Sequence, residues 1–255
     1  IAIEERDGVL NLLPTLPVGA PGTVGQRGRR KLRSFVIPHI PHDDVVLPEE
    51  IQGLRMFGSE SDTETVANVM ADHLQTMRNK HAITLEHLRM GALKGVILDA
   101  DGSVLYDLFE EFEITPAVFN FELNKKDTDV KKKCLDLKRY FEMNLKGEYM
   151  TNVRMLVSSD FFDALTGHPN VVKAYQWYQE SLALRIDQRS GFTFAGVTFE
   201  EYLGQASDMN GVVRRFIEPG EGQAFPEGTL DTFATYFAPA DFNETVNTLG
   251  QPLYA

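Results

Sequence analysis

The sequence predicts an α+β protein, and three observations carry this prediction. Apolar residues recur at helical spacing over residues 61–94, apolar runs flank a turn signal within residues 96–109, and helix and strand signals alternate between residues 120 and 227. The chain has 255 residues, a length at which folding buries roughly 75% of the unfolded surface. One large domain or two modest domains are therefore expected.

Composition and charge exclude several classes of protein. The net charge of −12 argues against a protein that coats nucleic acid tightly, because sequence-independent affinity comes from Lys and Arg that neutralise phosphates. No apolar run approaches the ~20 residues that a membrane helix needs, so no membrane partner is expected. The single cysteine, Cys134, cannot form an intrachain disulfide, which fits a reducing compartment such as a bacterial cytoplasm.

The first 58 residues are rich in proline and glycine and show no helical periodicity. This composition predicts extended strands and loops without a core of their own. The apolar residues of this arm therefore need a partner outside it.

A long helix is predicted to begin at Ser61. Ser61 and Glu64 have the spacing of a capping box, and Asp62 adds negative charge to the first turn, where the helix dipole favours it. The apolar stripe that follows consists of Val66, Met70, Leu74, Met77, Leu85, Leu88 and Ala92. It ends at Gly95 and implies a helix of roughly 50 Å. We expect part of its exposed flank to contact another element or subunit.

The segment from Val96 to Phe109 predicts a β-hairpin that turns at Asp101-Gly102, a pair that tolerates positive φ. A second amphipathic helix is expected over residues 127–147, where Gly147 is placed to end it.

Shorter elements follow. Residues 154–157 predict a strand, residues 160–167 a short helix, and Pro169 the first turn of a longer helix. Residues 192–203 predict a hairpin turning near Ala195-Gly196, and residues 204–228 predict a glycine-rich loop.

Motifs of the common enzyme classes are missing from the sequence, which contains no Walker loop, GxSxG, HExxH or paired CxxC. His39, His42, Asp43 and Asp44 offer ligand types that zinc or manganese accepts. Both histidines follow prolines in an extended segment, so surface loop residues are the favoured interpretation. We therefore expect no catalytic residue, no cofactor and no metal.

Three further patterns also favour a structural interpretation. Asp99, Asp101 and Glu110 match three ligand positions of a calcium loop, but Val104 occupies the position of the required glycine. Gly220-Glu221-Gly222 is too short for a dinucleotide fingerprint and predicts a loop. The histidines of the long helix are expected to be packed or interfacial, and they are His73, His81 and His87.

The arm carries one basic cluster followed by an acidic one. The residues are Arg27, Arg29, Arg30, Lys31 and Arg33, then Asp43, Asp44, Glu49 and Glu50. A solvated charge run is the usual interpretation of such a cluster. On an extended arm, a second hypothesis is that these charges contact reciprocal charges on neighbouring copies and orient their assembly.

Two stretches carry a family resemblance. Phe35 to Ser59 (FVIPHIPHDDVVLPEEIQGLRMFGS) and Thr232 to Ala255 (TFATYFAPADFNETVNTLGQPLYA) resemble the lambda-type major capsid proteins of tailed bacteriophages, the protein E family. The order of elements between them is also similar to that of this family.

The resemblance implies a Hong Kong 97-type capsid fold. Residues 1–53 would form the N-terminal arm and E-loop, residues 54–119 the peripheral domain with its spine helix at about 61–94 and a β-hairpin, residues 120–227 the axial domain, and residues 228–255 a strand returning to the peripheral domain. The lysine and asparagine through which some relatives crosslink have no match here, so no such activity is assigned.

The resemblance also implies partners and a location. The expected function is a self-assembling shell of hexamers and pentamers that encloses double-stranded DNA without sequence-specific binding, helped by scaffold, portal and decoration proteins. The protein would lie in the virion, and in the host cytoplasm during assembly. The alternatives are an encapsulin-like bacterial compartment and a soluble α/β enzyme built around Asp99, Asp101 and Asp107.

Overall fold

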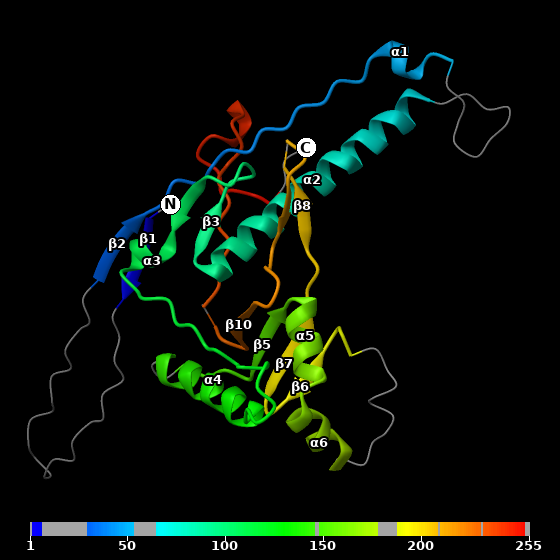
Figure 1. Cartoon of the computed structure of the whole chain (residues 1–255). Helices are drawn as coiled ribbons and strands as arrows, with labels where there is room; N and C mark the ends of the chain where they lie inside the picture. Colours follow the sequence, from blue (N-terminus) through cyan, green and yellow to red (C-terminus); the bar gives the residue numbers. More distant parts are fainter. Residues whose placement is uncertain are drawn as a thin grey trace, which may run out of the picture. The chain divides into compact units, whose positions relative to one another are not determined.

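The structure is a computed structural model with the mixed α+β content that the sequence predicts (Figure 1). It describes residues 2–6, 30–53, 65–145, 148–177, 188–208, 210–230 and 232–252. By contacts the chain forms two compact units. The first unit comprises Ile1–Pro41, Tyr140–Thr151 and Gly228–Ala255, and the second comprises His42–Arg139 and Asn152–Glu227. The division into arm, peripheral and axial parts is a functional one and stays a prediction.

A four-stranded mixed sheet lies at the centre of the second unit, with the strand order β10-β5-β7-β6. The strands are β5 (Asn152–Val157), β6 (Phe192–Phe194), β7 (Val197–Glu201) and β10 (Gly222–Glu227). Strand β5 runs parallel to β7 and antiparallel to β10, and β6 runs antiparallel to β7. The predicted strand at residues 154–157 is thus confirmed as an inner strand.

One face of this sheet is apolar because side chains alternate along a strand. On β5, Val153, Met155 and Val157 are buried, whereas the residues between them are half-buried. Val197 and Phe199 on β7 are fully buried on the same core. The period of two in the sequence therefore sets which face of the sheet is covered.

Three helices follow or precede these strands: α4 (Val130–Asn144), α5 (Ser159–Thr166) and α6 (Pro169–Trp177). Helix α5 buries Phe161, Phe162 and Leu165, and the Phe161 ring stacks on Phe199 of β7 with centroids 6.4 Å apart. The Ser158 hydroxyl accepts the N–H of Phe161 at 3.4 Å and caps the helix. The starts of these three helices agree with the predicted ones within three residues. Gly147 lies outside the described residues.

Polar side chains link all four strands on the other face of the sheet. The Thr193 hydroxyl on β6 lies 3.2 Å from that of Thr198 on β7, and Asn152 of β5 donates to Thr198 at 2.9 Å. Asn152 also donates to Glu227 of β10 at 3.1 Å. We call this row of contacts the polar ladder.

Arg154 completes the polar ladder. Its Nε donates to Glu227 at 2.5 Å and its Nη1 to Glu200 at 2.7 Å, so one guanidinium joins β5 to both neighbouring strands. The bonds to Glu227 and Glu200 raise the pKa of Arg154. Such charge-assisted bonds are stronger than neutral ones.

The hairpin of β6 and β7 turns at the predicted pair. Ala195 has φ 49° and Gly196 φ 80°, and two consecutive positive values are the requirement of the two-residue turn that matches strand twist. Gly196 suits its position in this turn, whereas the Cβ of Ala195 makes a positive φ less favourable, so Ala-Gly is a weaker turn signal than Asn-Gly.

The long helix is α2 (Val66–Lys94), with 29 residues and a length of about 44 Å at 1.5 Å per residue. Thr65 is extended, and its hydroxyl accepts the N–H of Asn68, so the described helix begins after Thr65 and not at Ser61. Ser61 itself lies outside the described residues. The end at Gly95 agrees with the prediction, because Gly95 adopts the left-handed C-cap with φ 88°.

The C-terminal half of α2 is the half that packs. Met90 is buried with Phe216 and Ile217, and partly buried residues surround them, including Leu93, Leu156, Tyr202 and Ala206. The Tyr202 hydroxyl donates to Glu86 at 2.8 Å. Among the helices of the described ranges, none has the length and apolarity required to cross a membrane.

The predicted hairpin at residues 96–109 is confirmed in outline and corrected in detail. Strands β3 (Val96–Leu98) and β4 (Val104–Asp107) pair antiparallel. The turn is longer than two residues, because the Gly102 N–H donates to the Asp99 carbonyl at 2.9 Å. The second strand is also shorter than predicted.

Helix α3 (Leu108–Phe112) replaces the end of that predicted strand. The Asp107 carboxylate accepts the N–H groups of Phe109 and Glu110 at 2.9 and 3.2 Å. An N-cap aspartate therefore outweighs the apolar pattern here.

The prediction of a loop over residues 204–228 is wrong. This region contains β10 and a two-stranded ribbon of β8 (Gln205–Ser207) and β9 (Val213–Arg215). Pro226 obscured β10, but β10 is an edge strand, where a missing N–H is tolerated. Very short strands of the β8 and β9 kind carry too little periodicity to detect.

Arg214 of the ribbon fixes the tip of the β3–β4 hairpin. Its guanidinium donates to the carbonyls of Ala100 and Asp101 at 3.0 and 2.5 Å, and to the Asp208 carboxylate at 3.1 Å. Gly102 lies under this guanidinium with φ 88°, and a Cβ there would be 2.6 Å from Nη1. Gly102 is thus required both for the turn and for the approach of Arg214.

The described residues of the first unit contain little regular structure. Strands β1 (Ala2–Arg6) and β2 (Arg30–Ser34) pair antiparallel, with Ala2 opposite Ser34 and Arg6 opposite Arg30. Residues 232–252 contain one 3-10 turn, Asn243–Thr245, and no strand. The expected return strand is therefore not found in that described range.

We predict that Phe199→Ala lowers the free energy of unfolding of the second unit by about 3–5 kcal/mol, because it removes a fully buried ring from the centre of the core. Circular dichroism during urea unfolding measures this change. Leu203→Ala is the matched control, since Leu203 is 65% exposed and should change stability by less than about 0.5 kcal/mol. Equal effects of the two substitutions would contradict the described core.

Candidate assembly surface

The extended segment 42–47 lies along the N-terminal half of α2 (Figure 1). His73 Nδ1 lies 2.7 Å from Asp44 Oδ2, and Lys80 Nζ donates to His42 Nε2 at 3.2 Å. The one-turn helix α1 (Pro48–Ile51) follows, with proline in its first turn. Segment 42–47 and α2 therefore run in opposite directions, and polar contacts join them at two positions along the helix, His73 and Lys80.

The contact with His73 is the main reason that the pKa of Asp44 is lowered, and the Val45 N–H contributes. A lowered pKa in the folded state means that this contact stabilises the docked segment above the ordinary aspartate pKa of 3.8. The stabilisation is lost as the pH falls through the lower, folded value.

The histidines of α2 have the packed or interfacial environments that were predicted. The His81 ring meets His42 edge-on, with centroids 6.2 Å apart, and the His87 ring lies 5.4 Å from Phe216. Within the described part of the chain, no group of three or more His, Cys, Asp or Glu is arranged to hold a metal ion. His42 and Asp44 instead contact Lys80 and His73.

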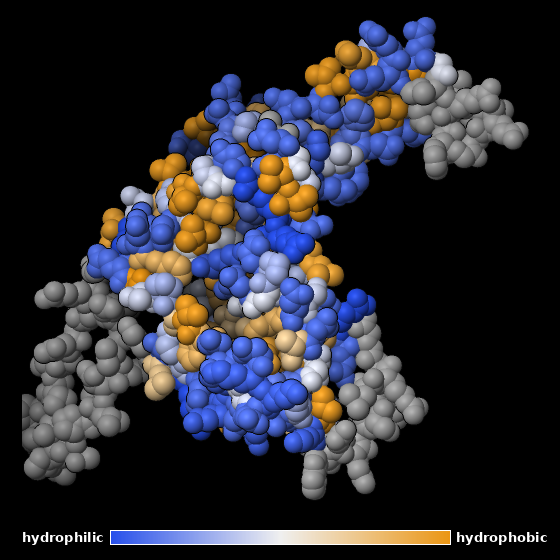
Figure 2. Space-filling model, in the orientation of Figure 1, coloured by the Kyte–Doolittle hydropathy of each residue, from blue (hydrophilic) through white to orange (hydrophobic). Residues whose placement is uncertain are grey.

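Large apolar side chains are exposed beside these polar contacts. They belong to one turn-by-turn row on α2 and to the adjoining segment, and they are Val66, Met70, Leu74, Val45 and Leu47. We call this set the α2 patch. Figure 2 shows hydrophobic residues on the end that carries α1. Clustered exposed apolar residues mark sites of interaction more often than isolated ones do.

The structure places the predicted charged residues in two different units. Arg30 and Lys31 lie on β2, where Lys31 is the register partner of Glu5, and Arg33 is opposite Ile3. Arg27 and Arg29 lie outside the described residues. The acidic residues belong to the second unit; Asp43 and Glu49 are exposed, and Glu50 accepts the Leu47 N–H at 3.3 Å.

The three carboxylates of the enzyme alternative accept hydrogen bonds from nearby groups in turns and in a helix cap. Asp99 accepts the Ala100 N–H at 2.7 Å, and Asp101 accepts both the N–H and the hydroxyl of Ser103 at 2.8 and 2.6 Å. The Ser103 contacts lower the pKa of Asp101. Asp107 caps α3. These bonds shape the hairpin and do not converge on one site.

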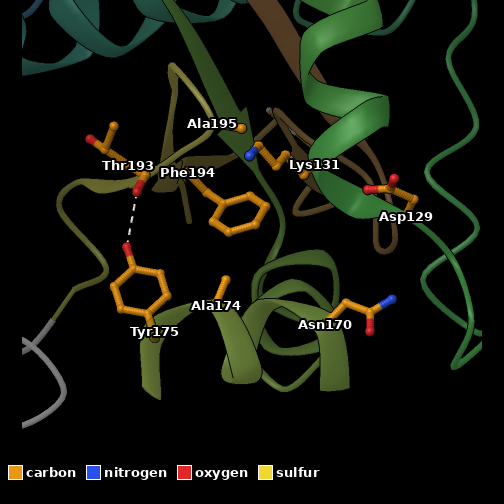
Figure 3. Close-up of a pocket in the computed structure, with 8 residues that line it drawn as sticks. All are labelled: Asp129, Lys131, Asn170, Ala174, Tyr175, Thr193, Phe194 and Ala195. Atoms are coloured by element: carbon orange, nitrogen blue, oxygen red, sulfur yellow. Dashed lines mark hydrogen bonds between the residues drawn. The ribbon is translucent and has the colours of Figure 1, made fainter. Parts of the chain in front are cut away.

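A pocket of about 700 Å³ lies between the starts of α4 and α6 and the β6–β7 turn (Figure 3). Its residues are Asp129, Lys131, Asn170, Ala174, Tyr175, Thr193, Phe194 and Ala195. The Tyr175 hydroxyl donates to the Thr193 carbonyl at 2.9 Å and closes one side. The Tyr175 and Phe194 rings stack with centroids 6.4 Å apart and make the wall apolar.

Buried polar contacts hold the wall of this pocket in place. His168, only 2% exposed, accepts the Asn170 N–H at Nδ1 and lies 2.9 Å from the Lys125 carbonyl through Nε2. Asn170 donates to the Thr128 carbonyl at 2.8 Å. No sequence pattern predicts this pocket, and its one local signal is the run of lysines at the start of α4.

Comparison with known proteins identifies relatives of the whole chain. Residues 1–255 match the family described as phage major capsid protein E. The chain is 34% identical over 275 aligned residues to the major capsid protein of Pseudomonas phage KPP10, which covers 100% of this chain and 77% of the relative. It is 30% identical over 250 residues to the major capsid protein of Salmonella phage Felix O1, covering 87% of this chain and 68% of that protein.

We predict that Asp44→Ala releases segment 42–47 from α2, because it removes the acceptor of His73 and of the Val45 N–H. Hydrogen exchange of this segment should become faster at neutral pH. Asp43→Ala is the control, since Asp43 is its exposed neighbour. In the unaltered protein the same release should occur as the pH falls below about 4; exchange that is independent of Asp44 would contradict the contact.

Proposed function

The chain belongs to the phage major capsid protein E family, and we propose that it is the structural protein that builds a phage head by binding copies of itself. The observation that carries this proposal is the family match over residues 1–255, together with relatives named major capsid protein at 34% and 30% identity. The exposed α2 patch supports it, since self-assembly gives these apolar residues a partner.

The finer architecture that we propose is the Hong Kong 97-type capsid fold. A 29-residue helix whose first half is exposed fits a spine helix that contacts neighbours. The extended segment beside it fits the E-loop, and the mixed sheet with its helices fits an axial domain. The proposed parts keep the boundaries 1–53, 54–119, 120–227 and 228–255.

The assembly that we propose is a shell of hexamers and pentamers located in the virion, formed in the host cytoplasm. Scaffold, portal and decoration proteins are its proposed partners. A net charge of −12 supports enclosure of DNA without adhesion to it. Many weak contacts repeated over the shell stabilise it through multivalency.

The encapsulin-like alternative is not favoured, because both curated relatives are phage capsid proteins. The family is a structural one, and the hairpin carboxylates of the enzyme alternative are occupied by turn and cap contacts.

The direct test is to express the protein alone and with its neighbouring phage genes, and to image the sedimented product by electron microscopy. Shells or rings with fivefold and sixfold symmetry are the expected result. A compact monomer at every ionic strength would overturn the proposed function.

We predict that the double substitution Met70→Glu and Leu74→Glu prevents assembly while the protein stays folded. Both side chains are exposed, at 50% and 54%, so a charge costs the monomer little but is buried unpaired in a contact. Thr76→Glu is the control, because Thr76 is exposed on another face of the same helix. Sedimentation and circular dichroism separate loss of assembly from loss of folding; shells in normal yield would exclude the α2 patch as a contact.

We also propose that the basic cluster of the arm orients neighbouring copies through charge. Reversal of Arg29 and Arg30 to Glu should slow assembly and reduce its dependence on salt, because exposed charges act mainly on association rate and orientation. Light scattering at several ionic strengths measures both quantities. Unchanged assembly of this variant would refute the role of the cluster.

A further inference from the structure

Residues 125–139 form a basic region in an acidic chain. They include seven Lys and Arg and three Asp, a local charge of +4 within a total of −12. Lys125 and Lys133 contact Glu122, and Arg139 contacts Asp136. The remaining lysines are Lys126, Lys131, Lys132 and Lys138, which make no ion pair within the described residues.

Two of these lysines flank the pocket of Figure 3. Lys131 and Lys138 are seven residues apart on α4, so they share one face of the helix. Lys131 lines the pocket (Figure 3). Lys138 Nζ lies 3.6 Å from the position that a Cβ would take at Gly196, the residue after the pocket residue Ala195. Asp129 also lines the pocket, but its carboxylate accepts the Lys132 N–H at 3.0 Å.

The pocket therefore has an apolar wall and a rim with a net positive charge. Its wall is held by hydrogen bonds of Tyr175 and Asn170 to backbone carbonyls, so it is formed before a partner arrives. A matching partner carries an apolar side chain next to unpaired carboxylates. Such a partner would bury its apolar side chain against the wall and place its carboxylates near the lysines of the rim.

An exposed segment of this chain has that chemistry. Residues 110–119 (EEFEITPAVF) begin in α3 and continue without regular structure. Ile114 is 56% and Val118 90% exposed. The side chains of Glu110 and Glu111 are exposed and make no hydrogen bond or ion pair within the described part of the chain.

A second acidic and apolar segment, residues 43–50, matches less well. Asp44 already binds His73, and Glu50 accepts the Leu47 N–H. Its carboxylates are thus partly used within the second unit. In residues 110–119, by contrast, neither Glu110 nor Glu111 has such a contact within the described part of the chain, and the exposed Ile114 and Val118 follow them.

We propose that the pocket rimmed by Lys131 and Lys138 binds the segment 110–119 of a second copy of this chain. The inference rests on the proposed self-assembly and specifies one of its contacts. The two surfaces are different, so the contact is heterologous: each copy offers a pocket to one neighbour and a segment to the other. Heterologous contacts close into rings when the rotation permits, which is the geometry that a capsomer requires.

Cross-linking tests the contact, and the chain is well suited to it. Its single cysteine, Cys134, is fully buried, and burial raises the pKa of its thiol to about 12, so introduced cysteines react selectively. Ala174→Cys marks the pocket and Ile114→Cys marks the segment. A mixture of the two single variants, assembled and treated with a short bismaleimide, should yield covalent dimers, and the double variant should yield a ladder of multimers.

Two controls make this result specific. Neither single variant alone should form dimers, and Ala174→Cys mixed with Val45→Cys should not, because Val45 lies in the competing acidic segment. Reversal of Lys131 and Lys138 to Glu should lower the dimer yield about tenfold. Reversal of Glu110 and Glu111 to Lys in the other copy should restore it.

The outcomes separate this inference from the proposed function. Shells that form without dimers between positions 174 and 114 overturn the contact and leave the capsid function intact. Dimers with position 45 instead, or a yield unaffected by reversal of both lysines, also overturn it. Failure of the unaltered protein to assemble under any condition overturns both proposals.

Discussion

The burial of one face of strand β5 is the constraint on which the second unit depends. Val153, Met155 and Val157 lie in the core, while the backbone of β5 pairs with β7 on one side and β10 on the other. The helices that follow β5 can cover only the face that these residues make apolar. Ser158 then ends the strand, caps α5 and accepts the Gly220 N–H at 2.9 Å, which brings the start of β10 into register. A shift of β5 by one residue would expose this core and bury Arg154.

Burial is unevenly distributed along the chain, and this distribution connects fold to function. The second half of α2 packs against Phe216 and Ile217, whereas Met70 and Leu74 of its first half are exposed. An isolated monomer gains nothing from an apolar row in water. In the proposed assembly the same helix serves two cores, one within the chain and one that forms when copies meet. The proposed contact of the basic pocket would add a second interaction of different chemistry.

Elements with strong local signals were predictable from sequence. Helices α2 and α6 and the hairpin of β6 and β7 are specified by periodicity, by Pro169 and by the Ala195-Gly196 turn. Three features were not predictable: the start of α2, the helix at residues 108–112 and the strands within residues 205–227. Each of them is decided by a single cap residue or by a pairing partner that is distant in sequence. Strand β10 forms through β5, some 70 residues earlier in the chain, and no local window contains that information. The same applies to the pocket, which combines α4, α6 and β6, and to the contact of Asp44 with His73, 29 residues away.

The polar ladder determines how the sheet can come apart. Edge strands ordinarily fray one residue at a time, since each backbone bond near an end opens on its own. Here, removal of β10 must also break the bonds of Glu227 to Asn152 and Arg154, and these residues are in turn held to Thr198 and Glu200 on the next strand. Pulling on the edge thus loads three strands together. Under force, β10, β5 and β7 should therefore separate in one cooperative step and not one strand at a time.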